Sequence, residues 1–350
     1  MKVCIIGPSS PRYMPFVSCY EEVLQSQDTK YDIIGWDRHL LGETGNTLVM
    51  YSRDGTASGW RVIPGYLGYR KFVLRWLAEN EYDFYIVLTA QVGIALLDFL
   101  ASRRFILDIR DFSHEDMLPY RIALSVLMKK SLVVAISSPG FKNWLPTSKN
   151  IILSHNTTIS ALHVSSLPFD FGSKRLLNIG GMIYYQEDLD FINCASKLNG
   201  WEIEYVGKGV YERQLEQYCR DNALPVTFRG AFGPEEKISH YRRANFVISH
   251  YGNRTQNTRT LLPNRLYESC VLGRPIIVCE GTYLGETVRG ERIGVATSLK
   301  SVSEMSRQLN WYYVPSNYDE YLSHCRLFLE KVEKDVIHFQ EIVGSLLESC

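Results

Sequence analysis

Short apolar runs alternate with longer segments of mixed polarity through the first 155 residues. The runs at 3–6, 31–36, 83–88, 105–109, 132–136 and 151–154 are largely apolar and rich in β-branched or aromatic residues. Such runs are typical of parallel strands that are buried on both faces. Amphipathic stretches at 66–80, 90–102 and 119–130 lie between several of them and predict helices. This alternation predicts a doubly wound α/β domain over residues 1–160.

The same pattern restarts after a polar segment. Residues 157–174 are rich in Ser and Thr and include Pro168 and Gly172, which favours a domain boundary. Strands are then predicted at 176–179, 203–206, 226–228, 246–249 and 275–278, and helices at 188–198, 211–222, 235–243 and 265–272. We therefore expect a second α/β domain over 175–315, and a helical segment over 316–350 that returns to the first domain.

Length and charge support this organisation and limit the function. A chain of 350 residues exceeds the roughly 250–300 residues at which single cores stop growing. Lys plus Arg equals Asp plus Glu, at 38 each, which argues against a broad basic surface for nucleic acid. None of the eight cysteines forms a Cys-x-x-Cys pair, so we expect buried, reduced thiols.

The sequence shows no signal for export or membrane insertion. The N-terminal apolar run is too short for a signal peptide, and no stretch of about 18 apolar residues occurs. We therefore expect a cytoplasmic protein, with peripheral contact to the inner face of the membrane as an option. Segments 66–77 and 117–130 are basic and apolar enough for such contact. We favour the alternative, in which they are outer helices packed on the sheet.

Glycine-rich turns follow three predicted strands of the second half. They are Gly180-Gly181, Gly207-Lys208-Gly209 and Gly230. Ligands of open parallel sheets bind beyond the carboxyl ends of the strands, where glycine lets them approach the backbone. One such turn is weak evidence, but three in one domain predict the rim of a binding site.

Residues 262–277 combine a helix start with charged side chains. Pro263 is expected to open a helix, whose free amides and Arg265 could hold a phosphate. Glu268 lies about one turn inside and could accept two hydrogen bonds from a ribose diol. A plain helix–turn–strand with a solvated Glu268 is the alternative.

This segment resembles the donor-site signature of retaining GT-B glycosyltransferases of the family 4 type. The turn at 207–209 and the segments 227–230 and 241–246 resemble three further motifs of that family, in the same order. The resemblance covers about residues 176–290. It implies two Rossmann-like domains facing a cleft, and sugar transfer from a nucleoside diphosphate sugar to a hydroxyl of a saccharide or lipid-linked saccharide. It also implies cell-surface polysaccharide synthesis, retained anomeric configuration, and no metal or cofactor.

The resemblance also implies roles for individual residues. Glu268 would bind the donor ribose, and the helix start would face the diphosphate. The turns would border the base, and the loop after the first glycine pair would lie near the phosphates. The donor-binding residues implied are Gly181, Gly207, Lys208, Arg229, Gly230, Asn264, Arg265 and Glu268.

Three positions depart from the family pattern. Thr260 stands where the family often has a glutamate, and the loop 181–186 lacks its usual Arg and Lys. Asn245 replaces an aspartate, which we interpret as a structural change. The diphosphate charge could instead be met by Arg254, Arg259 or Arg265.

The first domain offers titratable residues after one strand. Asp111 and His114 follow the run at 105–109 and could orient or deprotonate an acceptor hydroxyl. The alternative is an Asp–Arg pair and a surface histidine at the start of the next helix.

Other motifs narrow the possibilities. The dinucleotide fingerprint Gly-x-Gly-x-x-Gly is absent, which disfavours a nicotinamide oxidoreductase. Asp188 and Asp190 are interpreted as caps of a helix start, not as metal ligands. A sugar-nucleotide epimerase of the same fold and a non-catalytic nucleotide-sugar-binding partner subunit remain alternatives to the transferase.

Overall fold

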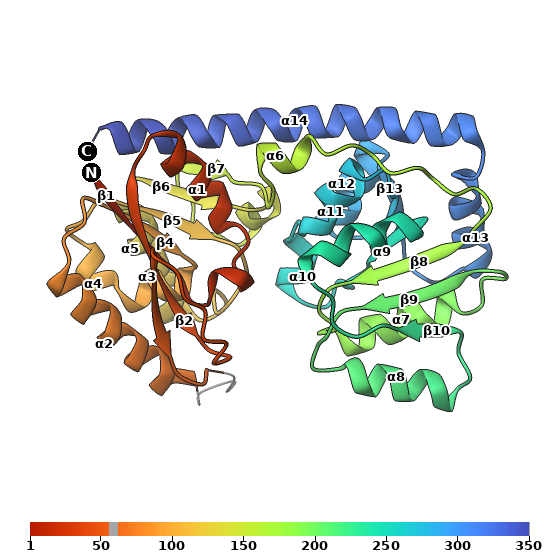
Figure 1. The fold of residues 1–350 in the computed structure, drawn as a ribbon, viewed down its shortest axis with the longest axis horizontal. Coiled ribbons are helices and arrows are strands. Elements are labelled where there is room, and N and C mark those ends of the chain that lie inside the picture. Colours follow the sequence, from red (N-terminus) through yellow and green to blue (C-terminus); the bar gives the residue numbers. More distant parts are fainter. Residues whose placement is uncertain (56–61, 350) are drawn as a thin grey trace. The chain divides into compact units, whose positions relative to one another are not determined.

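The computed structural model describes residues 1–55 and 62–349 as two compact units (Figure 1). The first unit holds Met1–Thr158 together with the C-terminal segment from Lys334 onward. The second unit holds Ile159–Glu333. Each unit is an α/β fold built around its own parallel sheet. The prediction of two doubly wound α/β domains is therefore confirmed.

Seven parallel strands form the sheet of the first unit within the described residues. The sheet order is β3-β2-β1-β4-β5-β6-β7, with the direction of progression reversing between β1 and β4. The apolar runs of β1, β4 and β5 are almost completely buried, as the sequence pattern predicts. The strands are β1 Lys2–Ile6, β2 Lys30–Asp37, β3 Leu48–Ser52, β4 Phe84–Leu88, β5 Phe105–Ile109, β6 Val133–Ile136 and β7 Ile151–Leu153.

Helices connect these strands. The predicted helix over 90–102 is broken at Leu96 into α3 and α4, and α1 was not predicted. The aromatic residues of α2 pack inward, with Tyr69 stacked on Trp36 at 5.7 Å between ring centroids. For α2 the packed interpretation is therefore confirmed. The helices are α1 Val17–Ser26, α2 Ile63–Glu79, α3 Ala90–Ala95, α4 Leu97–Leu100 and α5 Leu118–Lys130, with 3-10 turns η1 Pro11–Tyr13 and η3 Pro139–Asn143.

The second unit contains a six-stranded parallel sheet within the described residues, in the order β10-β9-β8-β11-β12-β13. The strands are β8 Arg175–Ile179, β9 Glu202–Val206, β10 Val226–Phe228, β11 Phe246–Ser249, β12 Ile276–Cys279 and β13 Gly294–Thr297. The helices are α6 Ile159–Leu162, α7 Tyr185–Ala195, α8 Glu212–Asp221, α9 Lys237–Arg243, α10 Gln256–Thr260, α11 Asn264–Val271, α12 Tyr283–Glu291 and α13 Val302–Trp311, with the turn η4 Pro234–Glu236. Strand β13 and helices α10 and α12 were not predicted.

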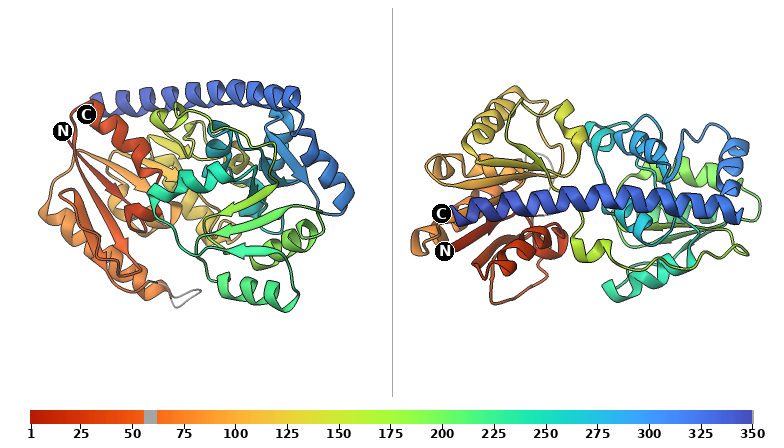
Figure 2. Two further views of the ribbon diagram at one scale, coloured as in Figure 1. Left: turned by 45° about the vertical axis from the view of Figure 1, so that its right-hand side comes forward. Right: turned by 90° about the horizontal axis from the view of Figure 1, so that it is seen from above.

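The C-terminal helix α14 spans Pro315–Glu348 and belongs to both units (Figures 1 and 2). Its later part carries Phe339, Val343 and Leu347 into the core of the first unit. Phe339 meets the ring of Tyr20 edge-on, with the centroids 5.2 Å apart. The prediction that the C-terminal helices return to the first domain is confirmed.

The connection that enters β8 is fastened by Asn245, which is completely buried. Its Oδ1 accepts hydrogen bonds from the Ser173 hydroxyl and the Arg175 amide, both at 3.0 Å. Its Nδ2 donates to the Asp170 carbonyl at 2.7 Å. An aspartate could not make that last bond, so the substitution of Asn for Asp is structural, as predicted.

The cysteines agree with a further expectation. The cysteines from Cys4 to Cys325 are all buried and unpaired, as predicted, while Cys350 lies outside the described residues. Across residues 1–55 and 62–349, no helix combines the length and the apolar character needed to cross a membrane.

Candidate functional site

The glycine turns of the second unit lie next to one another at the carboxyl ends of three adjacent strands. The amide of Gly180, after β8, donates to the carbonyl of Val206 at 2.8 Å. The amide of Gly207, after β9, donates to the carbonyl of Gly230 at 2.7 Å. The structure thus brings together the turns that contain Gly181, Gly207, Lys208 and Gly230.

Close packing of the turns explains why two of these positions are glycine. Gly207 has φ of +128°, and a Cβ there would lie 2.1 Å from the carbonyl oxygen of Gly180. A Cβ on Gly209 would lie 2.3 Å from the carbonyl oxygen of Met182. No larger residue fits at either place. These glycines shape the rim through backbone contacts.

Arg265 extends from the second residue of α11 to the ends of the two central strands. Its Nη1 donates to Asn178 Oδ1, at the end of β8, and to the carbonyl of Ile248 in β11, both at 2.8 Å. Its Nη2 points toward Gly180 and lies 2.8 Å from the place of a Cβ there. Together with Gly181, His250 and Tyr251, Arg265 lines a small recess at this edge of the sheet. A cation is therefore held beside a glycine turn and a helix N-terminus.

Pro263 is the N-cap of α11 and has extended backbone angles, so the helix begins at Asn264. This corrects the prediction that the proline is the first helical residue. The backbone amides of Asn264 and Arg265 then lie in the first turn, where amides have no partner within the helix. The Arg265 side chain reaches from this first turn to the ends of β8 and β11.

Asp188, in the first turn of α7, is buried beneath this recess. Its Oδ1 accepts hydrogen bonds from Asn178 Nδ2 and the Tyr205 hydroxyl, each at 3.2 Å. Burial raises the pKa of Asp188 to about 7, although the nearby Arg265 opposes this shift. The prediction that Asp188 caps helix amides is wrong, because its Oδ1 bonds to two side chains of the sheet instead.

The second aspartate of that motif lies on the surface. Asp190 Oδ2 pairs with Arg254 at 2.9 Å, and Arg254 also contacts Glu187 at 3.4 Å. Within the described residues, no three His, Cys, Asp or Glu side chains gather into a metal-binding group.

Glu268 is held by two neighbours from α9. Lys237 Nζ pairs with its Oε1, and the Tyr241 hydroxyl donates to its Oε2 at 2.6 Å. The carboxylate remains about one-quarter exposed. Since each carboxylate oxygen has two lone pairs, these contacts leave acceptor capacity for a ligand. The Glu268 carboxylate is thus oriented by these two side chains and partly exposed, one turn from Arg265.

The other basic residues named in the sequence analysis do not line the recess. Lys208 is exposed at the tip of the β9 turn. Arg229 turns back to Glu204 in β9, with Nε 3.5 Å from the carboxylate. Arg259 Nε donates to the carbonyl of Asn253 at 2.7 Å. Of the three arginines proposed to replace the basic pair of the family, only Arg265 lines the recess.

Thr260 lies within the fold and not on the recess. It is buried at the end of α10, and its hydroxyl donates to the carbonyl of Gln256 at 2.8 Å. This position therefore supplies neither charge nor a surface hydroxyl.

Asp111 and His114 both lie beyond the carboxyl end of β5 in the first unit, and both are exposed. The ring of His114 meets Tyr120 edge-on at 5.6 Å. An Asp–Arg pair is present at this strand end, between Asp108 and Arg110. Arg110 forms two bonds with Asp108, at 2.5 and 2.6 Å, in a buried pair. That pair fixes the strand end and leaves Asp111 on the surface.

Comparison with known proteins bears on the fold. No protein-family profile and no curated protein sequence matches this chain. Among solved structures, sucrose-phosphate synthase from Thermosynechococcus elongatus aligns over all of both chains with a TM-score of 0.78 at 11% identity. Anabaena HepE, solved with UDP and glucose, aligns over all of both chains at 0.73 and 15%. The pneumococcal O-GlcNAc transferase GtfA, solved with UDP and GlcNAc, aligns over 99% of each chain at 0.66 and 9%.

The chain has the GT-B glycosyltransferase fold. This confirms the fold class that the sequence motifs implied. Because the sequence identities are 9–15%, the likeness to these structures concerns the fold alone.

Sequence reasoning missed part of this GT-B site. Hydrogen bonds link Arg265 to Asn178, Asn178 to Asp188, and Asp188 to Tyr205, and these four residues come from four separate elements. His250, directly after β11, is buried there as well, and burial lowers its pKa to about 4. Their place in the sequence could have identified two of these residues, because Asn178 lies in a predicted strand and His250 directly follows one.

Proposed function

We propose that this chain is a glycosyltransferase that moves a sugar from a nucleoside diphosphate sugar to a hydroxyl of a saccharide or lipid-linked saccharide. The observation that carries the proposal is Arg265, which is fixed by Asn178 and Ile248 and faces the turn at Gly180. A diphosphate in the recess would meet this guanidinium and the free amides of α11. The developing charge of the leaving group is stabilised there.

Glu268 is proposed to bind the ribose of the donor. Its carboxylate pairs with Lys237 and accepts a hydrogen bond from the Tyr241 hydroxyl. A vicinal diol can donate two hydrogen bonds to such a group. The turns at Gly207, Lys208 and Gly230 would then border the base.

A uridine donor is supported by the solved structures of the same fold. HepE was solved with UDP, with UDP-glucose, and with UDP and glucose, and GtfA with UDP and GlcNAc. We therefore propose UDP as the first nucleotide to test.

The acceptor is proposed to meet Asp111 and His114. Both side chains are exposed beyond the end of β5, where ligands of parallel sheets bind. An aspartate could orient or deprotonate the acceptor hydroxyl. We further propose transfer with retention and without a metal, with Arg265 and the α11 amides meeting the diphosphate charge.

Peripheral contact with a membrane is proposed for helix α5. Leu118, Ile122 and Val126 are spaced four residues apart and are 68%, 57% and 43% exposed. Residues at this spacing share one helix face. Arg121, Lys129 and Lys130 on the same helix supply positive charge for anionic lipid. Such contact would suit a lipid-linked acceptor.

The test combines binding with product analysis. Purified protein is screened for thermal stabilisation by UDP, GDP, CDP, TDP, ADP and NAD, because a ligand at 100 times its Kd adds about 2.7 kcal/mol. A selective rise with one nucleoside diphosphate supports the donor site, and a rise with NAD alone overturns it. The matching sugar nucleotide is then incubated with and without saccharide acceptors. Conversion of the donor without acceptor would indicate an epimerase, and binding without turnover a non-catalytic partner.

A further inference from the structure

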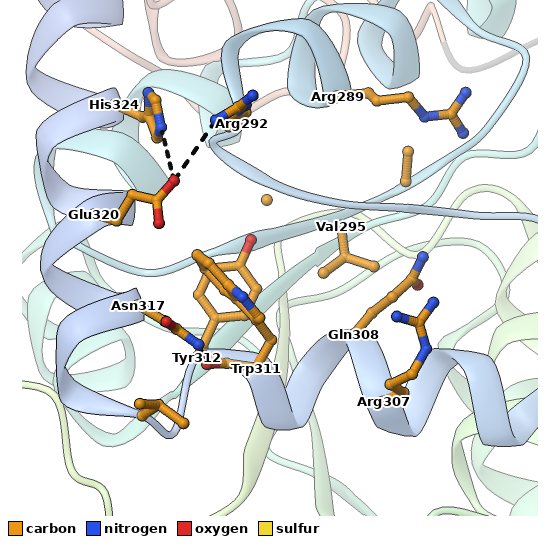
Figure 3. A pocket seen from close by; sticks show the side chains of 13 residues that line it. Arg289, Arg292, Val295, Arg307, Gln308, Trp311, Tyr312, Asn317, Glu320 and His324 are labelled. Carbon is orange, nitrogen blue, oxygen red and sulfur yellow. Dashed lines mark hydrogen bonds and ion pairs between the residues drawn. The ribbon is translucent and has the colours of Figure 1, made fainter.

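A separate pocket of about 650 Å³ lies in the second unit beside the edge strand β13 (Figure 3). It is enclosed by the end of α12, by α13 and by the start of α14. Its lining includes Arg292 and Gly294, at the amino end of β13. The glycine turns follow carboxyl ends of the same sheet, so this pocket and the donor recess are different sites.

Arginine side chains from two helices surround the opening. Arg289 and Arg292 come from the end of α12, and Arg307 comes from α13 (Figure 3). Arg292 contacts Glu320 at 3.6 Å, and Arg289 contacts Glu280 at 3.4 Å, in exposed pairs that contribute little. Arg307 forms no ion pair within the part of the chain that the structure describes. A ligand carrying carboxylate or phosphate groups could therefore recruit these guanidinium groups.

Arg292 has a left-handed backbone conformation that is unfavourable for a residue with a side chain. An arginine kept at such a position suggests that its side chain has a role. Arg292 terminates α12 in the left-handed region, with φ of +56°. Glycine is the usual residue at such a position because any Cβ is unfavourable there. The chain instead holds an arginine, whose side chain lines the pocket and contacts Glu320 (Figure 3).

The middle of the pocket offers a flat ring and an unsatisfied acceptor. Trp311 is 39% exposed although it is a large apolar residue, and Val295 also lines the pocket. Gln308, one turn earlier on α13, has a buried Oε1 with no hydrogen-bond partner within the described residues. A buried acceptor without a partner costs free energy, which rotation of the Gln308 amide toward a ligand hydroxyl would recover.

We propose that this pocket binds an acidic oligosaccharide. The indole of Trp311 supplies an apolar face for a pyranose ring, and Gln308 accepts from a hydroxyl. Arg292 and Arg307 hold the carboxylate or phosphate groups of the sugar. A ring, a hydroxyl and an anionic group occur together in this class of ligand. The proposal goes beyond the transferase activity and does not depend on the donor recess, since it is tested by binding alone.

The test is calorimetric titration of the full chain with α-1,4-hexagalacturonate, with maltohexaose and hexaglutamate as matched probes. Maltohexaose has rings without charge, and hexaglutamate has charges without rings. We expect binding of hexagalacturonate to be at least about tenfold tighter than binding of either matched probe. Equal binding of hexaglutamate or of inorganic phosphate would overturn the assignment to a saccharide, and no binding of hexagalacturonate would overturn the proposal.

Variants locate the binding and separate it from folding. Trp311→Ala and Arg307→Gln are each expected to weaken hexagalacturonate binding by about five- to tenfold. Arg292→Gly should weaken it similarly while leaving the Tm unchanged or a few degrees higher, because glycine relieves the left-handed backbone. Arg220→Gln, an exposed arginine on α8, is the control and should bind as the unmodified chain does. Unchanged binding by Arg292→Gly and Trp311→Ala would overturn the proposal.

Discussion

Arg265 occupies the space that a side chain at Gly180 would need. The Nη2 of Arg265 lies 2.8 Å from the place of a Cβ on Gly180, whose φ is +124°. That φ is outside the region that other residues adopt readily. The glycine thus permits two features together, a sharp turn after β8 and an arginine packed against that turn. The position of Arg265, the proposed phosphate-binding cation, therefore depends on a glycine at position 180.

Gly180→Ala should therefore weaken binding of a nucleoside diphosphate. The methyl group displaces the Arg265 guanidinium, and the backbone strain lowers the free energy of unfolding by about 1–3 kcal/mol. We expect UDP affinity to fall by about tenfold or more, measured by calorimetric titration. Gly200→Ala is the control, because Gly200 also has positive φ, at +76°, but nothing lies within 4 Å of its Cβ position. Equal UDP affinity in both variants would contradict the role of Arg265.

Glu268→Gln tests the ribose contact. The substitution keeps the shape and the Tyr241 bond, but it replaces one charged acceptor and removes the ion pair with Lys237. Donor binding should weaken by about 1–3 kcal/mol, with little change in the Tm. Glu216→Gln, an exposed glutamate paired with Arg220, is the matched control. Unchanged donor affinity in folded Glu268→Gln protein would refute the assignment.

Much of the fold could be predicted because its strands are buried on both faces and read as continuous apolar runs. The missed strands lack this property. Strand β3 (Leu48–Ser52) lies at an edge and is only half-buried, and β13 (Gly294–Thr297) is short and composed of small residues. Periodicity of apolar residues does not identify such strands.

Only those parts of the candidate site that lie in short contiguous motifs could be predicted from the sequence. The glycine turns and Glu268 lie in motifs that are contiguous along the chain. The contact between Arg265 and Asn178 joins residues 87 positions apart, so it depends on the sheet order. Asp188 shows the same limit, because its position at a helix start suggested a cap, whereas burial against Tyr205 decides its partners.

Asn245→Asp should destabilise the second unit. The aspartate loses the bond to the Asp170 carbonyl and places a negative charge in a completely buried position. We expect a loss of about 3 kcal/mol in the free energy of unfolding at pH 7. Urea denaturation measures this loss. Asn222→Asp, at an exposed helix end, is the control and should change stability by less than about 1 kcal/mol. Similar losses in both variants would contradict the role given to Asn245.

Ile122→Glu tests the membrane surface on α5. The side chain is 57% exposed, so the fold should be retained, while the charge opposes insertion among lipid chains. We expect binding to vesicles of anionic lipid, measured by sedimentation, to fall by about tenfold. Ile337→Glu is the matched control, because Ile337 is 42% exposed on α14. Vesicle binding that is absent in the unmodified chain, or equal in both variants, would refute this surface.

Asp188 should make the stability of the second unit depend on pH. Burial raises its pKa from an ordinary 3.8 to about 7, so the folded chain keeps a proton that the unfolded chain releases between those values. The stability contributed by this proton is greatest at low pH and falls as pH rises from about 4 to 7, by up to about 1.4 kcal/mol per pH unit. Above pH 7 both states are ionised and the contribution no longer changes.

Asp188→Asn isolates this effect, because both observed bonds to Asp188 end on Oδ1 and an amide oxygen can accept them equally well. The variant lacks the titration, so its stability relative to the unmodified chain should increase between pH 5 and pH 8. Urea denaturation at pH 5, 6, 7 and 8 measures the difference. Asp190→Asn, in the exposed pair with Arg254, should give no such trend. A constant difference across this range would mean that Asp188 is ionised throughout, with Arg265 outweighing the effect of burial.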